Sequence, residues 1–240
     1  MSTSKPGPVT YLSLEGVAAV HAGLSGLGLD WLSEEEQARL SAMSAPRRRA
    51  QFIAGRWLAR RCLSAHAGGR WQDYALSAPE DGPPQVLTSP AAAEHRYFSL
   101  SHSGDWLACA VSRETVGVDV ECSDRARDFQ AINEWMHEPE ALLTTPSGAQ
   151  EQQAWFYAQW TLKEAWLKHA TSAVPANASV APPRPSMRSA RFRACMGDEG
   201  VALVGQGRGF TVAVYPATRA TLRWEGGALA QVQWTGWKHG

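Results

Sequence analysis

One short segment constrains the fold more than any other, because apolar and polar residues alternate without interruption from Val116 to Glu121. Successive side chains of a β-strand point to opposite faces. The segment therefore predicts a strand whose three valines enter a core, while Gly117, Asp119 and Glu121 share the other face. Two carboxylates on one face repel each other, and a cation or solvent must relieve that repulsion.

This acidic face has two interpretations. Mg²⁺ takes oxygen ligands, usually one or two carboxylates completed by phosphate and water, and Gly117 leaves room for a group to approach the backbone. Alternatively, the segment is an ordinary edge strand with a solvated acidic face. A D-x-E pair is weakly specific, so the strand taken alone favours the solvated face.

A second charged feature closes a long helix expected over about residues 150–169. Trp160, Glu164 and Lys168 recur every four residues and therefore lie on one stripe of this helix. Glu164 could supply a third oxygen ligand, and Lys168 could meet a phosphate. Alternatively, the two form a common i, i+4 ion pair worth about 0.2–0.5 kcal/mol. The helix taken alone favours that structural role.

Two further helices are expected in the first part of the chain. Ser33 and Glu36 form a capping box ahead of a helix that reaches about residue 43. After Pro46, a basic helix should run over about residues 47–66, until the two glycines that follow it allow left-handed geometry.

The remaining pattern predicts strands in both halves, which indicates an α+β fold with two similar halves and a cleft between them. Short links imply that strands at 97–102, 106–111 and 115–121 form an antiparallel meander. Later strands are expected at 191–195, 201–204, 210–215, 221–224 and 229–234. We expect an N-terminal half over residues 1–114 and a C-terminal half over residues 115–240, each an antiparallel sheet packed with helices.

Composition argues against several classes of protein. Lys plus Arg and Asp plus Glu both total 23 in 240 residues, so strong affinity for nucleic acid or an anionic membrane is not expected. The chain lacks a run of about 18 apolar residues, a signal-peptide pattern and a CxxC pair among its four cysteines. These features lead us to expect a cytoplasmic protein without a membrane span.

Together, the two charged features resemble the signature of the 4′-phosphopantetheinyl transferase superfamily. That signature is a G-(V/I)-D-x-E strand followed by a (W/F)-(S/T/C)-x-K-E-x-x-x-K helix, here Gly117 to Glu121 and Trp160 to Lys168. Phe98 to Gly104 is similar to the family's (F/N)-x-S-H-S-G segment. Residues 47–60 resemble its basic helix, and Glu140 stands where the family carries an F-(S/T)-x-x-E acid.

The resemblance spans about residues 31–170 and, with the chain length, favours the monomeric two-half class that activates nonribosomal peptide synthetases, the surfactin-synthetase-activating type. In that class coenzyme A lies between two similar α+β halves. The implied reaction transfers 4′-phosphopantetheine from coenzyme A to a serine of an apo acyl or peptidyl carrier protein and releases 3′,5′-ADP. The implied cofactor is Mg²⁺, with Mn²⁺ not distinguished. The carrier could serve peptide, polyketide or fatty-acid synthesis.

The resemblance also implies which residues form the site. The metal ligands would be Asp119, Glu121 and Glu164. Glu164 is the first candidate for the general base and Glu140 the second, with a water as a third possibility, and Lys168 would act on the pyrophosphate. The implied contacts with coenzyme A are Arg47, Arg56, Ser101, His102, Lys163 and Lys168.

Two departures from the family pattern leave questions open. Gly82-Pro83-Pro84 stands where many members carry G-K-P, so the contact of that lysine is either missing or replaced by another residue, such as Arg70 or Arg96. The segment after residue 170 lacks the usual G-x-G loop, which leaves the carrier preference open.

Two rival functions are a non-catalytic module that binds coenzyme A or a carrier, and a metal-dependent phosphodiesterase. The intact acids argue against the first, because a chain that had lost catalysis has little reason to keep a repulsive carboxylate cluster. The small number of carboxylates and histidines argues against the second.

Overall fold

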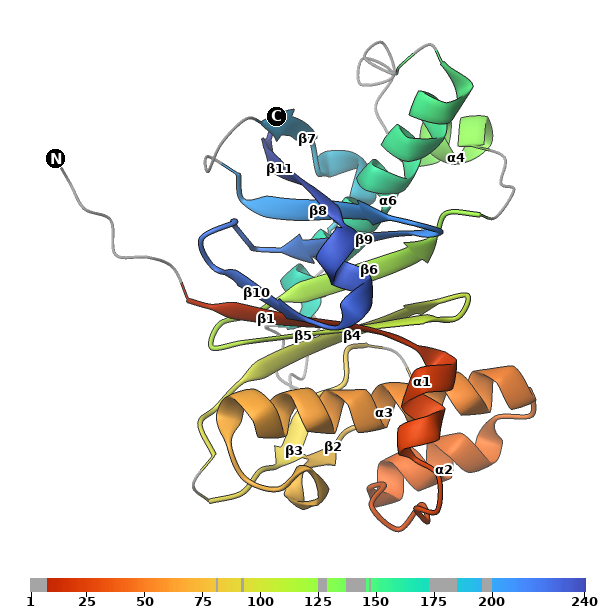
Figure 1. Cartoon of the computed structure of the whole chain (residues 1–240), viewed down its shortest axis with the longest axis vertical. Helices are drawn as coiled ribbons and strands as arrows, with labels where there is room; N and C mark the ends of the chain where they lie inside the picture. The colour runs from red at the N-terminus through yellow and green to blue at the C-terminus, as the bar shows by residue number, and fades with distance from the viewer. Residues whose placement is uncertain are drawn as a thin grey trace, which may run out of the picture.

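The computed structural model describes residues 8–80, 82–91, 93–124, 129–136, 146, 148–172, 185–195 and 200–240. Its main elements form two sheets, each covered on its outer face by one long helix, so the predicted α+β class is confirmed (Figure 1). The order of layers is helix, sheet, sheet, helix. Of the helices in these residues, none has the length and apolar character needed to cross a bilayer.

The first sheet has the strand order β10-β1-β5-β4. Its strands are β1 (Thr10–Gly16), β4 (Tyr97–Ser103), β5 (Trp106–Ser112) and β10 (Leu222–Glu225). β1 runs antiparallel to β5 but parallel to β10. β10 therefore brings a late segment of the chain into a sheet that is otherwise built from early segments.

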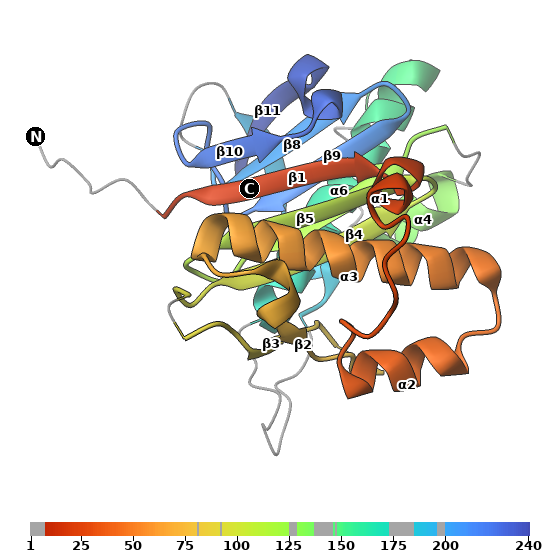
Figure 2. The same cartoon turned by 60° about the horizontal axis from the view of Figure 1, so that its bottom comes forward.

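α3 (Pro46–Ala67) covers the outer face of this sheet, as Figure 2 shows, and α1 (Val17–Gly23) packs beside it. α2 (Glu34–Ala42) lies on the side of α3 away from the sheet, and α3 is followed by the 3₁₀ turn η1 (Trp71–Asp73) and the short strands β2 (Ala75–Leu76) and β3 (Val86–Thr88). The capping box of Ser33 and Glu36 is confirmed. Gly68 and Gly69, with φ values of 95° and 77°, follow α3 as expected.

The second sheet has the strand order β6-β9-β8-β11-β7. Its strands are β6 (Gly117–Cys122), β7 (Phe192–Cys195), β8 (Ala202–Gly207), β9 (Phe210–Tyr215) and β11 (Gln233–His239). The accompanying helices and 3₁₀ turns are α4 (Phe129–Met136), α6 (Ala149–Ser172), η2 (Met187–Ser189) and η3 (Gly227–Gln231). The strand expected at 229–234 is wrong in its first part, because η3 precedes the strand there.

Alternation within single strands builds the three apolar layers. In β5, Ala108 and Ala110 face the second sheet, whereas Leu107, Cys109 and Val111 pack toward α3. In β6, all three valines of the alternating segment are at most 1% exposed and enter the core between the sheets. The predicted apolar face of this strand is therefore confirmed.

The expected three-strand meander is wrong at its third strand. β4 and β5 pair as an antiparallel hairpin, but β6 pairs with β9 and begins the second sheet. β6 lies beside β4 nonetheless, joined by serine side chains of β4 that accept hydrogen bonds from its backbone. The two sheets therefore meet along a seam between β4 and β6 that sequence periodicity does not specify.

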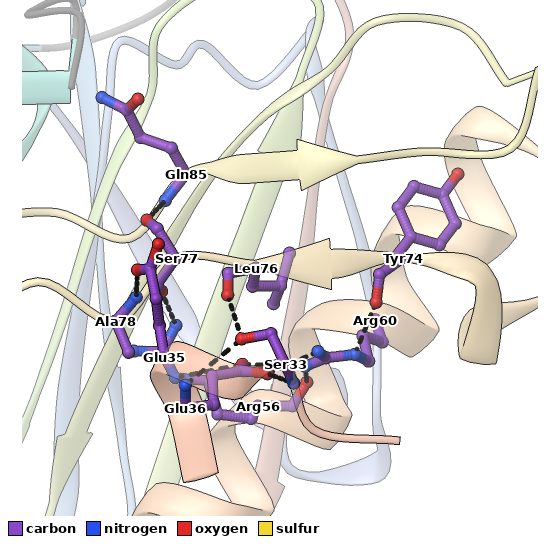
Figure 3. A network of polar contacts seen from close by, with 10 residues as sticks. All are labelled: Ser33, Glu35, Glu36, Arg56, Arg60, Tyr74, Leu76, Ser77, Ala78 and Gln85. Carbon is purple, nitrogen blue, oxygen red and sulfur yellow. Dashed lines mark hydrogen bonds and ion pairs between the residues drawn. The ribbon is translucent and has the colours of Figure 1, made fainter. Parts of the chain in front are cut away.

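A buried ionic network holds α2 against α3 (Figure 3). Glu36 is completely buried and receives hydrogen bonds from Arg60 at 2.9 and 2.5 Å. Arg60 also donates to the carbonyl of Tyr74, and Arg56 donates to that of Ser77. The network thereby fixes the backbone that follows α3 as well as the two helices.

Candidate functional site

Gly117 sets how closely α6 approaches the acidic strand. A Cβ at this position would lie 1.8 Å from the carbonyl oxygen of Ala165 and 2.7 Å from the amide nitrogen of His169. The group that approaches the glycine is therefore the helix itself. This contact places the charged stripe of α6 directly over Asp119 and its neighbours.

We expect Gly117→Ala to lower the unfolding free energy by about 1–3 kcal/mol or more, because backbone atoms must move to admit the methyl group. Gly55→Ala is the matched control, since its Cβ would have its nearest neighbour at 4.0 Å, in a side chain. Chemical denaturation measures both changes. Equal stability of the two variants would contradict the tight contact.

Asp119 is the most enclosed of the predicted metal ligands, with 5% of its surface exposed. Its Oδ1 accepts hydrogen bonds from Ser101 Oγ and from Lys168 Nζ, both at 2.7 Å. Its Oδ2 is buried and has no hydrogen-bond partner among the described residues. Because a buried carboxylate oxygen is costly when unpaired, Oδ2 is the atom at which a cation would be most favourable.

Glu121 lies two residues further along the same face. Its Oε2 accepts a hydrogen bond from Ser103 Oγ at 2.7 Å, and its Oε1 accepts one from the indole Nε1 of Trp160 at 3.0 Å. Ser103 comes from β4 and Trp160 from α6, so two elements orient this carboxylate. Both donors were missing from the sequence-based site, although Trp160 lies on the predicted stripe.

Glu164 is half-buried on α6, one turn before Lys168. Burial raises the pKa of its carboxyl, and the negative charges of Asp119 and Glu121 raise it further, while Lys168 lowers it. The effect of both neighbouring charges indicates that the three acids share one electrostatic environment.

The raised pKa has a measurable consequence for stability. An ionised Glu164 costs stability at neutral pH, and this cost disappears as the pH falls through the folded-state pKa. Without divalent ions, Glu164→Gln should therefore raise the unfolding free energy at pH 7.5 by up to about 1 kcal/mol. The gain should vanish near pH 4. Thermal unfolding in EDTA at both pH values measures it, and a less stable variant at pH 7.5 would contradict the assignment.

Two predicted coenzyme A contacts lie close to this cluster. Ser101 is bonded to Asp119, and the neighbouring His102 keeps an exposed side chain. Partial desolvation lowers the pKa of His102, as do the charges of Lys168 and Arg48, whereas Glu121 raises it. A phosphate near His102 would oppose this shift, because it stabilises the protonated imidazole.

Arg47 stands at the edge of a cavity between the halves, where its guanidinium forms an exposed ion pair with Asp105 at 3.0 Å. The cavity has a volume of about 560 Å³. Its lining residues are Arg47, Gly104, Asp105, Trp106, Cys122, Asp124, Arg208 and Gly209. It therefore opens beside the end of β6 that carries Glu121.

Two predicted contacts are not brought to the cluster. Arg56 is 7% exposed and serves the ionic network of α2 and α3, where burial lowers its pKa to about 10. Lys163 is 1% exposed and donates to the carbonyls of Met136 and Met187, both at 2.9 Å. Both side chains face the interior and contact other segments, and their assignment to coenzyme A stays a prediction. Glu140 lies outside the described residues.

The three acids do not form a ready-made metal centre. Within the ranges that the structure describes, no group of three His, Cys, Asp or Glu side chains is close enough to hold an ion. Hard oxygen donors nevertheless suit Mg²⁺, and the unpaired Oδ2 of Asp119 is a buried atom that an ion would satisfy. The residues therefore fit a divalent ion whose binding would bring the three carboxylates closer to one another, and not an ion held by ligands that are already in place.

Comparison with known proteins agrees with this geometry. A family model described as the 4′-phosphopantetheinyl transferase superfamily matches residues 115–188, which contain β6 and α6. The transferase HetI of a Nostoc species is 30% identical over 57% of this chain and 58% of its own length. The transferase Sfp of Bacillus subtilis is 26% identical over 57% and 64%. Over the residues that contain the acidic strand and the K-E helix, the chain is similar to the 4′-phosphopantetheinyl transferase superfamily.

The matches to superfamily members are partial in length. The transferase gsp of Aneurinibacillus migulanus is 32% identical over 30% of each chain, so the chain spans between about a third and two thirds of these relatives. Among solved structures, the acyl carrier protein synthase of Mycobacterium tuberculosis matches with a TM-score of 0.32 and 20% identity. That match covers 44% of this chain and 96% of the other.

Proposed function

We propose that this chain transfers the 4′-phosphopantetheine group of coenzyme A to a serine of an apo carrier protein, with Mg²⁺ as cofactor and 3′,5′-ADP as the second product. The observation that carries the proposal is the meeting of Asp119 with Lys168 and Ser101 at the seam between the two sheets. These residues belong to the acidic strand, the K-E helix and the S-H-S-G segment, the three parts of the family signature.

The two-half layout supports the type that activates nonribosomal peptide synthetases. Each sheet carries one long helix, and the predicted site residues come from both halves. The carriers are acyl or peptidyl carrier proteins. The domain division at residues 114 and 115, a monomeric state and a cytoplasmic location stay predictions of the sequence.

In the proposed reaction, the serine oxygen forms a bond to the phosphorus that bears the pantetheine arm, and the bond from this phosphorus to the leaving 3′,5′-ADP breaks. Positioning and charge neutralisation do most of the work in such transfers. Asp119, Glu121 and Glu164 would hold Mg²⁺, which neutralises charge on the pyrophosphate when bound. Lys168, whose Nζ lies 2.7 Å from Asp119 Oδ1, would bind oxygens of the pyrophosphate.

The serine proton needs an acceptor, for which the described residues offer Glu164. Its raised pKa makes it a better base than an ordinary carboxylate near neutral pH. Coordination of a metal would lower that basicity, so Glu140 and a water stay as alternatives. His102, together with Arg47 at the cavity edge, would bind the coenzyme A phosphates.

Mass spectrometry tests the proposal directly. Apo carrier proteins of the peptidyl and acyl types are incubated with the protein, coenzyme A and MgCl₂, with EDTA in a parallel sample. We expect the mass of one phosphopantetheine on the carrier serine, and none with EDTA. Thermal stabilisation by coenzyme A without modification of any carrier would instead favour a non-catalytic binding module.

A further inference from the structure

Three alternate serines of β4 face the acidic strand across the seam. Ser99 Oγ accepts a hydrogen bond from the amide of Val118 at 3.1 Å, and Ser103 Oγ accepts one from the amide of Cys122 at 3.1 Å. Ser101 makes the equivalent bond with Val120 at 3.3 Å. The serines therefore replace the backbone carbonyls that a neighbouring strand would normally offer.

The hydroxyl of Ser103 has a second role that its geometry determines. A hydroxyl carries a single proton, and at Ser103 this proton points to Glu121 Oε2 at 2.7 Å while the amide of Cys122 occupies a lone pair. Ser103 is itself 8% exposed, so water competes little for either bond. The amide thus orients the hydroxyl, and the hydroxyl orients the carboxylate.

The opposite oxygen of Glu121 is held in a similar way by the indole of Trp160 at 3.0 Å. One donor on each oxygen fixes the plane of the carboxylate. Each carboxylate oxygen can accept more than one bond, so these two hydrogen bonds do not by themselves prevent a carboxylate oxygen from binding a cation.

We infer that Ser103 is a positioning residue that fixes the Glu121 carboxylate for metal binding, an inference that rests on the proposed function. Groups that orient a metal ligand typically change metal affinity by about 10–100-fold when removed. Ser99 serves as the control that distinguishes positioning of Glu121 from the structural role of joining β4 to β6. It makes the same bond to β6, and among the described residues no carboxylate accepts its hydroxyl.

The test compares Ser103→Ala with Ser99→Ala and with Ser103→Thr, which keeps the hydroxyl. The first readout is the MgCl₂ concentration for half-maximal carrier modification. The second readout does not depend on activity. It is the MgCl₂ concentration that gives half of the maximal increase in unfolding temperature when MgCl₂ is added at a constant concentration of coenzyme A. We expect Ser103→Ala to need about 10–100-fold more MgCl₂ in both, and Ser99→Ala and Ser103→Thr to stay near wild type.

Loss of the amide bond should cost both alanine variants about 1 kcal/mol of stability, so stability alone does not separate them. Identical MgCl₂ requirements for Ser103→Ala and Ser99→Ala in an active protein would overturn the inference and leave the proposed function intact. A wild-type protein that modifies no carrier and shows no MgCl₂ response would instead refute the proposed function.

Discussion

Glu36→Ala is expected to lower the unfolding free energy by about 3–5 kcal/mol, the cost of removing one partner from a buried ion pair. Arg60 would keep its positive charge with no exposed surface, and its remaining acceptors in the described part of the chain would be the backbone carbonyls of Tyr74 and Arg56. Arg56, 3.7 Å from Glu36, would add a second positive charge to the same interior (Figure 3). The expected fall in melting temperature is roughly 6–20 °C.

Differential scanning calorimetry measures this change. Glu34→Ala is the matched control, because Glu34 lies in the same first turn of α2 but is exposed. It should cost less than about 1 kcal/mol. The double variant Glu36→Leu, Arg60→Met should recover part of the loss, since an apolar pair leaves less uncompensated charge. A Glu36→Ala protein as stable as Glu34→Ala would show that the pair contributes nothing.

Asp119→Asn should reduce kcat/KM for carrier modification by more than about 100-fold, or about 2.7 kcal/mol of transition-state stabilisation. The change removes the charge at a carboxylate whose second oxygen is buried and, among the described residues, has no hydrogen-bond partner. It keeps an oxygen that can accept from Ser101, and it relieves repulsion with Glu164. The fold should therefore survive, with stability changed by at most about 1 kcal/mol.

Steady-state kinetics and thermal unfolding of the same preparation separate the two effects. Glu114→Gln removes a carboxylate from the exposed link before β6 and should leave kcat/KM unchanged. Unfolding of Asp119→Asn at room temperature would mean that the carboxylate is structural. Normal activity would remove Asp119 from the proposed metal site.

The sequence predicts the acidic strand well because the period of two is a local property. The valines of β6 enter the core and the acids face α6, as alternation requires. The absence of a side chain at Gly117 predicts that another group approaches its backbone closely, and the backbone of α6 does so. That this group is α6 depends on the packing of a helix distant in the chain, and no local pattern contains that information.

The arginine and lysine assignments show the limit of helical spacing. Arg56 lies on the basic helix as predicted, but on the side of α3 that packs against α2 and the segment after α3, where solvent does not reach its charge. Its guanidinium turns to Glu36 and to a backbone carbonyl instead. Lys163, next to Glu164 in the chain, points about 100° away on the helix and donates to the carbonyls of two other segments.

The serine seam was also inaccessible to periodicity. Ser99, Ser101 and Ser103 alternate in the sequence, whereas the family resemblance implies a coenzyme A contact only for Ser101 and His102 of this segment. Their bonds run from side chain to backbone between two different sheets. Strand patterns predict which face a side chain takes. They do not predict that serine hydroxyls of β4 accept the hydrogen bonds of β6 amides in place of the carbonyls of a neighbouring strand.

The parallel pairing of β10 with β1 affects how the chain folds while it is being synthesised (Figure 2). β1 leaves the ribosome well before Leu222 to Glu225, because the whole segment between residues 16 and 222 is synthesised in the interval. At about 5–20 residues per second, one edge of β1 waits roughly ten to forty seconds for its partner. During that interval the nascent chain presents an open strand edge to chaperones and to other nascent chains.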